Sequence, residues 1–380
     1  MPLTDENQLN NNADYSFYNT LHEAGDYLLA LGGCEVVALD TEFIRTRTFY
    51  PIPALYQLNG AGRIALLDAT DPGDWSDFTK LLSSESQIKV MHACSEDLEV
   101  FSRHFGLSPN RLFDTQVAHA FISEEFSISY ARLVHAMFGV ELDKQETRSN
   151  WLMRPLTNRQ LNYAADDVHY LLEIYEIMRN KLVQLNRLDW FEEEMRTILR
   201  PRGVTPENYF RSVKRSGSLS SAELSILQEM CMWREKQARS EDVPRSQIVK
   251  DEFLVLIAAL PRPDPGELRK ILDRRTNEKY GLHISRAFEA GSSKPSEQHP
   301  LPAAPPLSKS QGNVIKKLKK HANLIATELQ VAPELLGRKR DLEASLRSFL
   351  ATGELAEIHC GWRKDLIGEK FLAIMKEGAF

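Results

Sequence analysis

The apolar positions in the first part of the chain form short runs separated by turn-prone residues. Residues 35–39 (EVVAL), 54–58 (ALYQL) and 63–68 (RIALLD) are brief and rich in aliphatic side chains. Residues 88–92 form another such run. Short apolar runs of this kind, bounded by residues such as the YPIP that precedes 54, predict β-strands.

Two segments in the same region have helical spacing instead. Ser95 is a predicted N-cap, and the apolar face after it consists of Leu98, Phe101 and Phe105. Thr157 and Gln160 fit a capping box, which predicts a long helix that runs to about Asn180. Strands interleaved with helices predict an α/β domain with a mixed sheet.

The strand pattern disappears after about residue 215. Apolar side chains then recur at helical spacing in two blocks, 216–290 and 308–380, and both predict small all-helical domains. Between them, GSSKPSEQHPLPAAPP contains five prolines and predicts an extended linker. The predicted organisation is therefore an α/β domain over 1–205, a helical domain over 216–290, a linker over 291–307 and a second helical domain over 308–380.

Composition narrows the class of protein. A chain of 380 residues with 42% hydrophobic and 26% charged residues is typical of two or three soluble domains. The longest apolar run, Phe253–Leu260, is far shorter than the roughly 18 residues that cross a membrane. The opening residues are polar and acidic, unlike a secretory signal. The four cysteines form no C-x-x-C pair, so we expect reduced thiols in a cytoplasmic protein without a membrane partner.

Charge is distributed unevenly. The chain carries a net −6, yet residues 308–380 contain 13 Lys or Arg and only 9 Asp or Glu. Lys316, Lys317 and Lys320 lie on the predicted helix face opposite Ile315 and Leu318. These lysines could bind RNA phosphates, with an affinity that falls as salt rises. A solvated lysine face explains the pattern equally well.

Candidate chemistry begins with carboxylates at two places in the α/β region. Asp40 and Glu42 follow the first predicted strand at spacing i, i+2, so both project from one face. Asp97 falls in the first turn of the helix predicted to start at Ser95, where the helix dipole favours an acid. Each feature alone is explained better by a solvated turn or an ordinary helix start.

A third feature is Tyr163 with Asp167, at spacing i, i+4 on the long predicted helix. This spacing places both side chains on one face, about 5–6 Å apart at Cβ. A tyrosine beside an acid is common on helices. Only the combination of this pair with the earlier acids points to a shared site.

In combination, D-x-E, S-E-D-L and Y-x-x-x-D resemble the tyrosine subclass of the DEDD exonucleases. The segments DTEF, YPIPALYQL, VMHACSEDLEVF, FDTQ and YAADDVHYLL resemble the ribonuclease D family over residues 30–185. The histidine subclass would have His at position 162, which is Asn here. The resemblance implies a ribonuclease H-like exonuclease domain with a mixed sheet, followed by two HRDC-type helical domains, which are less closely matched than the exonuclease domain.

The resemblance also implies a mechanism. Asp40, Glu42, Asp97 and Asp167 would bind two divalent metal ions, Mg²⁺ or Mn²⁺, which prefer oxygen ligands. Asp40 would bridge the two ions, Glu42 and Asp167 would serve the ion beside the attacking water, and Asp97 the other. Tyr163 would orient that water, because a phenol with a pKa of about 10 is a poor base.

The expected reaction is hydrolysis of RNA from its 3′ end with release of nucleoside 5′-monophosphates. The family's expected substrates are precursor tRNA 3′ ends, and we expect a monomer. Two alternatives remain open: a DNA 3′–5′ exonuclease, which would share the carboxylates, and a non-catalytic RNA-binding scaffold.

Three further residues receive weaker interpretations. Arg45 and Gln57 could contact the RNA backbone. Asp166, next to Asp167, replaces a residue that is usually small in the family, and we interpret it as a solvated neighbour rather than a further metal ligand.

Overall fold

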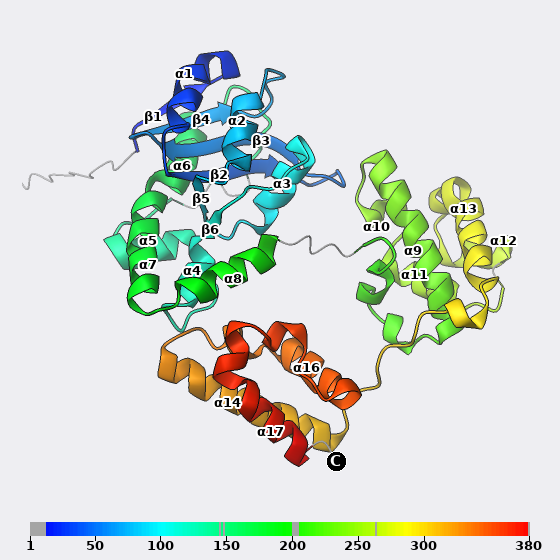
Figure 1. Ribbon diagram of the computed structural model, residues 1–380. Coiled ribbons are helices and arrows are strands. Elements are labelled where there is room, and N and C mark those ends of the chain that lie inside the picture. The colour runs from blue at the N-terminus through cyan, green and yellow to red at the C-terminus, as the bar shows by residue number, and fades with distance from the viewer. Residues whose placement is uncertain (1–12, 144–145, 147–148, 200–204, 263, 379–380) are drawn as a thin grey trace, which may run out of the picture. The chain divides into compact units, whose positions relative to one another are not determined.

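The computed structural model describes residues 13–143, 146, 149–199, 205–262 and 264–378 (Figure 1). The chain divides into two compact units. Unit 1 comprises Met1–Ile44, Pro53–Arg200 and Leu307–Phe380, and unit 2 comprises Arg45–Ile52 and Pro201–Pro306.

Unit 1 is built on a six-stranded sheet in the order β1-β4-β3-β2-β5-β6. The strands are β1 Tyr15–Tyr18, β2 Val36–Ile44, β3 Ile52–Gly60, β4 Arg63–Asp68, β5 Ile88–Met91 and β6 Leu112–Asp114. Strands β3 and β4 pair antiparallel, whereas β1 with β4, β2 with β5, and β5 with β6 pair parallel. The predicted mixed sheet is confirmed, although β1 and β6 had no distinct sequence signal.

Strand β2 continues beyond the predicted end at Leu39. Val37, Ala38 and Leu39 are buried, and the strand then runs on to Ile44. Asp40 and Glu42 therefore lie inside a strand and not in a turn after it. A regular strand backbone keeps both side chains on one face of the sheet.

Eight helices follow or connect these strands in the described part of residues 13–199. They are α1 Leu21–Leu31, α2 Ser76–Ser83, α3 Ser95–Phe105, α4 Thr115–Ala120, α5 Tyr130–Phe138, α6 Asn158–His169, α7 Leu171–Gln184 and α8 Leu188–Leu199.

The start of α3 differs from the prediction. Ser95 is the first helical residue, Cys94 occupies the N-cap, and no side chain of the cap accepts a hydrogen bond. The Asp114 carboxylate instead accepts hydrogen bonds from the backbone amides of Ala93 (3.1 Å) and Cys94 (3.0 Å). The N-cap prediction was wrong because the acceptor comes from β6, distant in the sequence.

The capping box of Thr157 and Gln160 is confirmed at the start of α6. The predicted continuous helix to Asn180 is wrong, since α6 ends at His169 and α7 begins at Leu171. The Tyr130 hydroxyl accepts a hydrogen bond from the Tyr170 amide and donates one to the Asp166 carbonyl, both at 3.2 Å. A side chain that inserts into the backbone hydrogen-bond ladder in this way breaks a helix.

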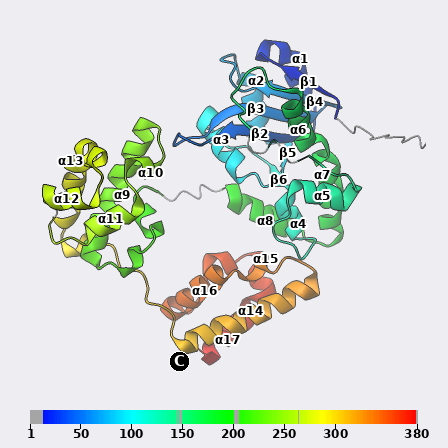
Figure 2. The same ribbon diagram turned by 180° about the vertical axis from the view of Figure 1, so that it is seen from behind.

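The C-terminal helices belong to unit 1. They are α14 Lys309–Leu329, α15 Glu334–Gly337, α16 Lys339–Thr352 and α17 Glu369–Gly378, with the short turns η4 Glu357–His359 and η5 Lys364–Gly368. Figure 2 shows α14 to α17 packed together as one bundle. The sequence predicts an all-helical block over residues 308–380, and no strand occurs in the described part of it, residues 308–378.

This bundle shares a hydrophobic core with the α/β part of unit 1. Trp362 stacks on Trp190 of α8, with ring centroids 5.3 Å apart. The Arg363 guanidinium donates to the Glu194 carboxylate at 2.7 Å, and both side chains are buried. Residues 308–380 therefore pack on the α/β part instead of forming an isolated module. The proposed domain boundaries stay predictions.

Unit 2 is helical over its described C-terminal part. Its elements are η1 Tyr209–Ser212, η2 Ser216–Ser218, α9 Ser221–Glu241, α10 Arg245–Ile248, α11 Asp251–Ala258, α12 Pro265–Ile271, α13 Arg274–Ser292 and η3 Ser296–Gln298. Helices α9 and α13 lie side by side (Figure 1). The proline-rich segment was predicted to be extended from residue 291. Instead, α13 extends through Ser292 and η3 covers Ser296–Gln298, so the segment lacks helical structure only after Gln298.

The segment Arg45–Ile52 completes unit 2. Its buried Phe49 joins the core of this unit. The Asp242 carboxylate accepts hydrogen bonds from the amides of Phe49 and Tyr50, each at 3.1 Å. Within the described residues of the whole chain, no helix combines the length and apolar character needed to cross a membrane.

The buried pair of Glu194 and Arg363 yields a stability prediction. We expect Arg363→Met to lower the free energy of unfolding by about 3–5 kcal/mol, because Glu194 would remain charged and buried without a partner. Urea denaturation measures this change. Replacing both residues, as Glu194→Leu with Arg363→Met, should recover most of the loss.

The exposed pair of Lys80 and Asp77, with side chains 75% and 51% exposed, supplies the control. Lys80→Met should lower the free energy of unfolding far less than Arg363→Met does, because solvent screens this exposed pair. An Arg363→Met variant no less stable than Lys80→Met would contradict the proposed role of this buried pair.

Candidate active site

Two candidate carboxylates project from the middle of the sheet. Asp40 and Glu42 on β2 are half-buried, and Thr41 between them is buried. β2 lies between β3 and β5 in the sheet, and its pairing with β5 covers Val36 to Ala38, just before Asp40. The two acids are thus placed by one of the inner strands.

Asp97 is brought to β2 by the first turn of α3. Its side chain is only 7% exposed, and the Thr41 hydroxyl donates a hydrogen bond of 2.5 Å to its carboxylate. The contact joins residues 56 positions apart in the sequence. Thr41 therefore fixes the third acid relative to the strand that carries the first two.

The third element is α6, which carries Tyr163 and Asp167. The Tyr163 hydroxyl donates a hydrogen bond to the Asp167 carboxylate. The Tyr163 ring also contacts the buried Trp151, with centroids 6.0 Å apart. The predicted i, i+4 pair is therefore in direct contact.

We call Asp40, Glu42, Asp97 and Asp167 the carboxylate cluster. Burial is the main cause that raises the pKa of Asp40 well above its usual range, followed by the charges of Asp97, Asp167 and Glu42. Burial and the charges of Asp167 and Asp97 do the same to the pKa of Glu42. The four acids are thus close enough to repel one another, although they come from three different elements.

The pKa values of the two remaining members of the cluster, Asp97 and Asp167, are also raised. Burial raises the pKa of Asp97 to about 6, against the opposing hydrogen bond from Thr41. Burial raises the pKa of Asp167 well above its usual range, and the charges of Asp166 and Asp97 add to this effect. Crowded acids of this kind take up protons or bind cations.

The donor set of the cluster suits a hard divalent cation. It consists of carboxylate oxygens, which Mg²⁺ and Mn²⁺ prefer. Cys94 is the nearest thiol in sequence to Asp97, and burial raises its pKa well above the usual range. The side chains are not arranged as a closed cage: in the part of the chain that the structure describes, no three His, Cys, Asp or Glu residues form a ready-made metal site.

Asp166 is not simply solvated. Its side chain is half-buried and accepts a hydrogen bond from the Ala13 amide. Burial raises its pKa to about 6 despite that hydrogen bond. Asp166 therefore adds negative charge beside Asp167.

Gln57 lies in the interior of unit 1. It is fully buried on β3, and neither its side-chain oxygen nor its nitrogen has a hydrogen-bond partner among the described residues. Asn59, on the same face of β3, donates to the carbonyls of Val168 and His169, which places that face under the end of α6. The RNA contact predicted for Gln57 stays a prediction, and burial speaks against it.

The basic candidates lie elsewhere. Arg45 is exposed in the segment of unit 2, and its Nε donates to the Phe49 carbonyl at 3.1 Å. Lys316, Lys317 and Lys320 are exposed on α14, while Ile315 is buried on its opposite face. The predicted orientation of the lysines is confirmed, and their role in RNA binding stays a prediction.

Two residues of the site carried no sequence signal that we used. Thr41 stands inside the D-T-E motif, and its bond to Asp97 depends on how α3 packs on β2. Burial raises the pKa of Tyr130 well above the usual range, and the charges of the nearby Asp167 and Asp40 add to this effect. Only tertiary structure brings Tyr130 to the end of α6.

Comparison with known proteins agrees with this arrangement. Residues 15–183 match the family model described as 3′-5′ exonuclease, and residues 223–287 match the HRDC domain. The chain is 37% identical to a ribonuclease D of Pseudomonas paraeruginosa over 342 residues, which covers 88% of this chain and 91% of that protein. It is 32% identical to ribonuclease D of Escherichia coli over 351 residues, covering 90% and 93%.

A solved structure is also similar over nearly the whole chain. The crystal structure of Escherichia coli RNase D, described as an exoribonuclease involved in structured RNA processing, matches with a TM-score of 0.89 and 32% identity. The match covers 96% of this chain and 99% of that one.

The raised pKa values predict how the cluster affects stability. Folded carboxylates with raised pKa values hold protons that the unfolded chain releases, so they destabilise the folded protein as pH rises above about 3.9. This destabilisation increases as the pH rises through 6, because burial raises the pKa of Asp97 to about 6. With a chelator present, Asp40→Asn should therefore raise the free energy of unfolding at pH 8 by roughly 1–3 kcal/mol.

The same variant should gain much less at pH 5, where the wild-type cluster is already partly protonated. Urea denaturation at the two pH values measures the difference. Asp26→Asn, on an exposed position of α1, serves as the control with an equal change in charge. An Asp40→Asn variant less stable than the wild type at pH 8 would show that the acids do not repel one another.

Proposed function

Because the chain belongs to the ribonuclease D family of 3′–5′ exoribonucleases, we propose that the carboxylate cluster is its catalytic centre and binds two divalent cations, Mg²⁺ or Mn²⁺. The observation that carries this proposal is the mutual electrostatic effect of four acids from β2, α3 and α6. Divalent cations would remove the repulsion that these acids otherwise impose.

The position of each acid supports a separate role. Asp40 is affected by the charges of all three other members, so it is best placed to share both cations. The charge of Asp167 raises the pKa of Glu42 more than that of Asp97 does, so Glu42 and Asp167 would hold the cation on their side. Asp97, oriented by Thr41, would serve the second. Bound cations supply a water of lowered pKa and stabilise charge on the attacking and leaving oxygens.

Tyr163 would act beside Asp167 by positioning water. Its hydroxyl already donates a hydrogen bond to Asp167, which fixes the phenol at the edge of the cluster. A phenol has an ordinary pKa of about 10 and is a poor general base near neutral pH. Its hydroxyl can still hold the attacking water in line with the phosphorus, which is a positioning effect.

The proposed substrate is RNA with a free 3′ end, degraded to nucleoside 5′-monophosphates. Precursor tRNA 3′ ends are the proposed natural substrates, in line with the description of the Escherichia coli relative as acting in structured RNA processing. We further propose that the protein acts as a monomer in the cytoplasm. Digestion of matched RNA and DNA oligonucleotides tests the choice of RNA, and faster loss of the DNA would overturn it.

Replacement of Asp40 tests the catalytic centre. We expect Asp40→Ala not to shorten a 5′-labelled RNA measurably at any practical Mg²⁺ or Mn²⁺ concentration, because the shared ligand of both cations is lost. Denaturing gels of the digestion follow product length. Asp26→Asn should digest the RNA at the wild-type rate, and an active Asp40→Ala enzyme would refute the proposed centre.

Replacement of Tyr163 tests the positioning of water. Tyr163→Phe should lower kcat by roughly 10²-fold, as expected for misplacement of a reacting group. The dependence of the rate on Mg²⁺ concentration should stay close to that of the wild type, since the carboxylates remain. A Tyr163→Phe enzyme with unchanged kcat would remove this role.

A further inference from the structure

A cavity at one edge of the sheet in unit 1 combines an apolar floor with exposed arginines. Its volume is about 350 Å³, and its walls come from the first residues of β5 and β6 and from α7 and α8. Binding sites for small ligands are commonly about 300–1,000 Å³, so this cavity suits a small molecule. The cavity is distinct from the carboxylate cluster, because Asp97 follows the opposite end of β5.

The floor of the cavity is aromatic and aliphatic. Phe113 of β6 and Phe191 of α8 are buried, with ring centroids 4.5 Å apart. Tyr175 of α7 packs on Phe113, with centroids 4.9 Å apart, and Met195 is buried one helical turn after Phe191. Apolar surface of this kind stabilises the apolar part of a ligand that covers it.

Helix α8 presents different faces to the C-terminal bundle and to the cavity. Trp190 and Glu194 contact the bundle and have i, i+4 spacing. Phe191 and Met195 line the cavity and have the same spacing, so they lie on a second face of the helix. The contacts that hold the bundle therefore leave the cavity face of α8 accessible to a ligand.

Three arginines surround the apolar floor. Arg111, Arg179 and Arg196 are exposed, and none of them forms an ion pair with a carboxylate in the part of the chain that the structure describes. Arg111 is nevertheless held in place, because its Nη1 donates hydrogen bonds to the carbonyls of Glu85 and Ser86, at 3.3 and 3.2 Å. These guanidinium groups are available to an anion.

Two of the arginines act on the same point of the cavity. Burial raises the pKa of Tyr175, and the charges of Arg179 and Arg111 oppose this effect. Glu176 and Glu35 act on the same phenol in the direction of burial, but neither lines the cavity. Guanidinium groups from α7 and from the start of β6 therefore converge near one phenol.

We propose that this cavity binds a small organic anion, which carries a carboxylate, phosphate or sulfonate group on an apolar body. The anionic group pairs with the arginines, since a guanidinium presents parallel N–H donors that match such groups. The apolar body lies on Phe113, Phe191 and Met195. Glu192 is the one acid among the described residues that line the cavity, so an excess of positive charge remains for the ligand.

The test compares two fluorescent probes that differ only in charge. Anilinonaphthalenesulfonate carries a sulfonate on an apolar body, and phenylnaphthylamine is the same body without the sulfonate. The fluorescence of both probes rises in apolar surroundings, so titration of the full chain gives a dissociation constant for each.

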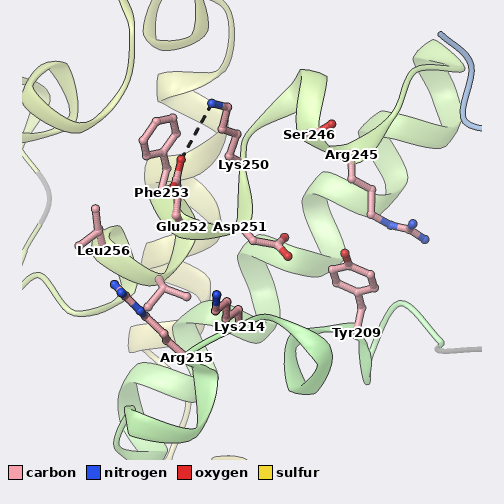
Figure 3. A pocket seen from close by; sticks show the side chains of 11 residues that line it. Tyr209, Lys214, Arg215, Arg245, Ser246, Lys250, Asp251, Glu252, Phe253 and Leu256 are labelled. Carbon is pink, nitrogen blue, oxygen red and sulfur yellow. Dashed lines mark ion pairs between the residues drawn. The ribbon is translucent and has the colours of Figure 1, made fainter. Parts of the chain in front are cut away.

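The variants remove equal charge from two different cavities. Arg179→Gln with Arg196→Gln is the cavity variant, because both residues are exposed on helices and have no ion pair to lose among the described residues. Lys214→Gln with Arg215→Gln is the matched control. It removes two exposed cations from the wall of a cavity in unit 2, which Figure 3 shows.

We expect the cavity variant to bind the sulfonate probe about tenfold more weakly than the wild type, because guanidinium contacts are lost. Its affinity for the uncharged probe should stay within about twofold, since the apolar floor is intact. The control should change either affinity by less than about twofold, because salt screens distant exposed charges. Equal losses in both variants, or an unchanged affinity of the cavity variant for the sulfonate probe, would overturn the proposal.

A second variant tests the apolar part of the site. Leu199 is half-buried at the cavity, at the end of α8, and Leu199→Trp places a larger side chain there. We expect weaker binding of both probes, by about fivefold or more, because less of the floor remains open. Urea denaturation checks that the variant is folded. Wild-type affinity for both probes in the folded variant would show that they bind elsewhere.

Discussion

Four carboxylates in a largely buried site repel one another, and the packing of unit 1 must hold them together against that repulsion. Asp40 experiences this most directly, since the charges of the three other acids all raise its pKa. Repulsion of this kind destabilises the folded chain above the ordinary carboxyl pKa, unless protons or cations compensate it. The proposed catalytic function requires this arrangement, because a site that binds divalent cations must concentrate negative charge before they arrive.

The fold opposes the repulsion by anchoring the four acids to three different elements, β2, α3 and α6. β2 lies between two neighbouring strands, the Thr41 hydroxyl ties Asp97 to that strand, and the Tyr163 hydroxyl contacts Asp167. Tyr130 bonds to the backbone on both sides of the break between α6 and α7. The C-terminal bundle extends the same core through Trp190 and Trp362. These contacts are polar or aromatic and directional, so they set the orientation of the acids as well as their proximity.

Local spacing predicted the parts of the site that depend on neighbours in sequence. The i, i+2 spacing of Asp40 and Glu42 and the i, i+4 spacing of Tyr163 and Asp167 follow from strand and helix geometry alone. The capping box of Thr157 and Gln160 could be predicted because it also depends only on residues close together in the sequence. The true start of α3 and the break after His169 could not be predicted from local spacing. They depend on hydrogen bonds from Asp114 and Tyr130, which are distant in the sequence. The packing of residues 308–380 on α8, and the cavity lined by α7 and α8, also depend on tertiary contacts that no local pattern shows.

A crystal structure of the protein soaked with Mn²⁺ tests the central claim most directly, because anomalous scattering locates the ion independently of any assumption about the ligands. The account predicts two anomalous peaks about 3.5–4 Å apart, with Asp40 between them and oxygens of the other three acids around them. Absence of bound Mn²⁺ at these residues, or an Asp97 or Asp167 carboxylate more than about 10 Å from Asp40, would contradict it, since ligand oxygens lie only about 2 Å from such an ion.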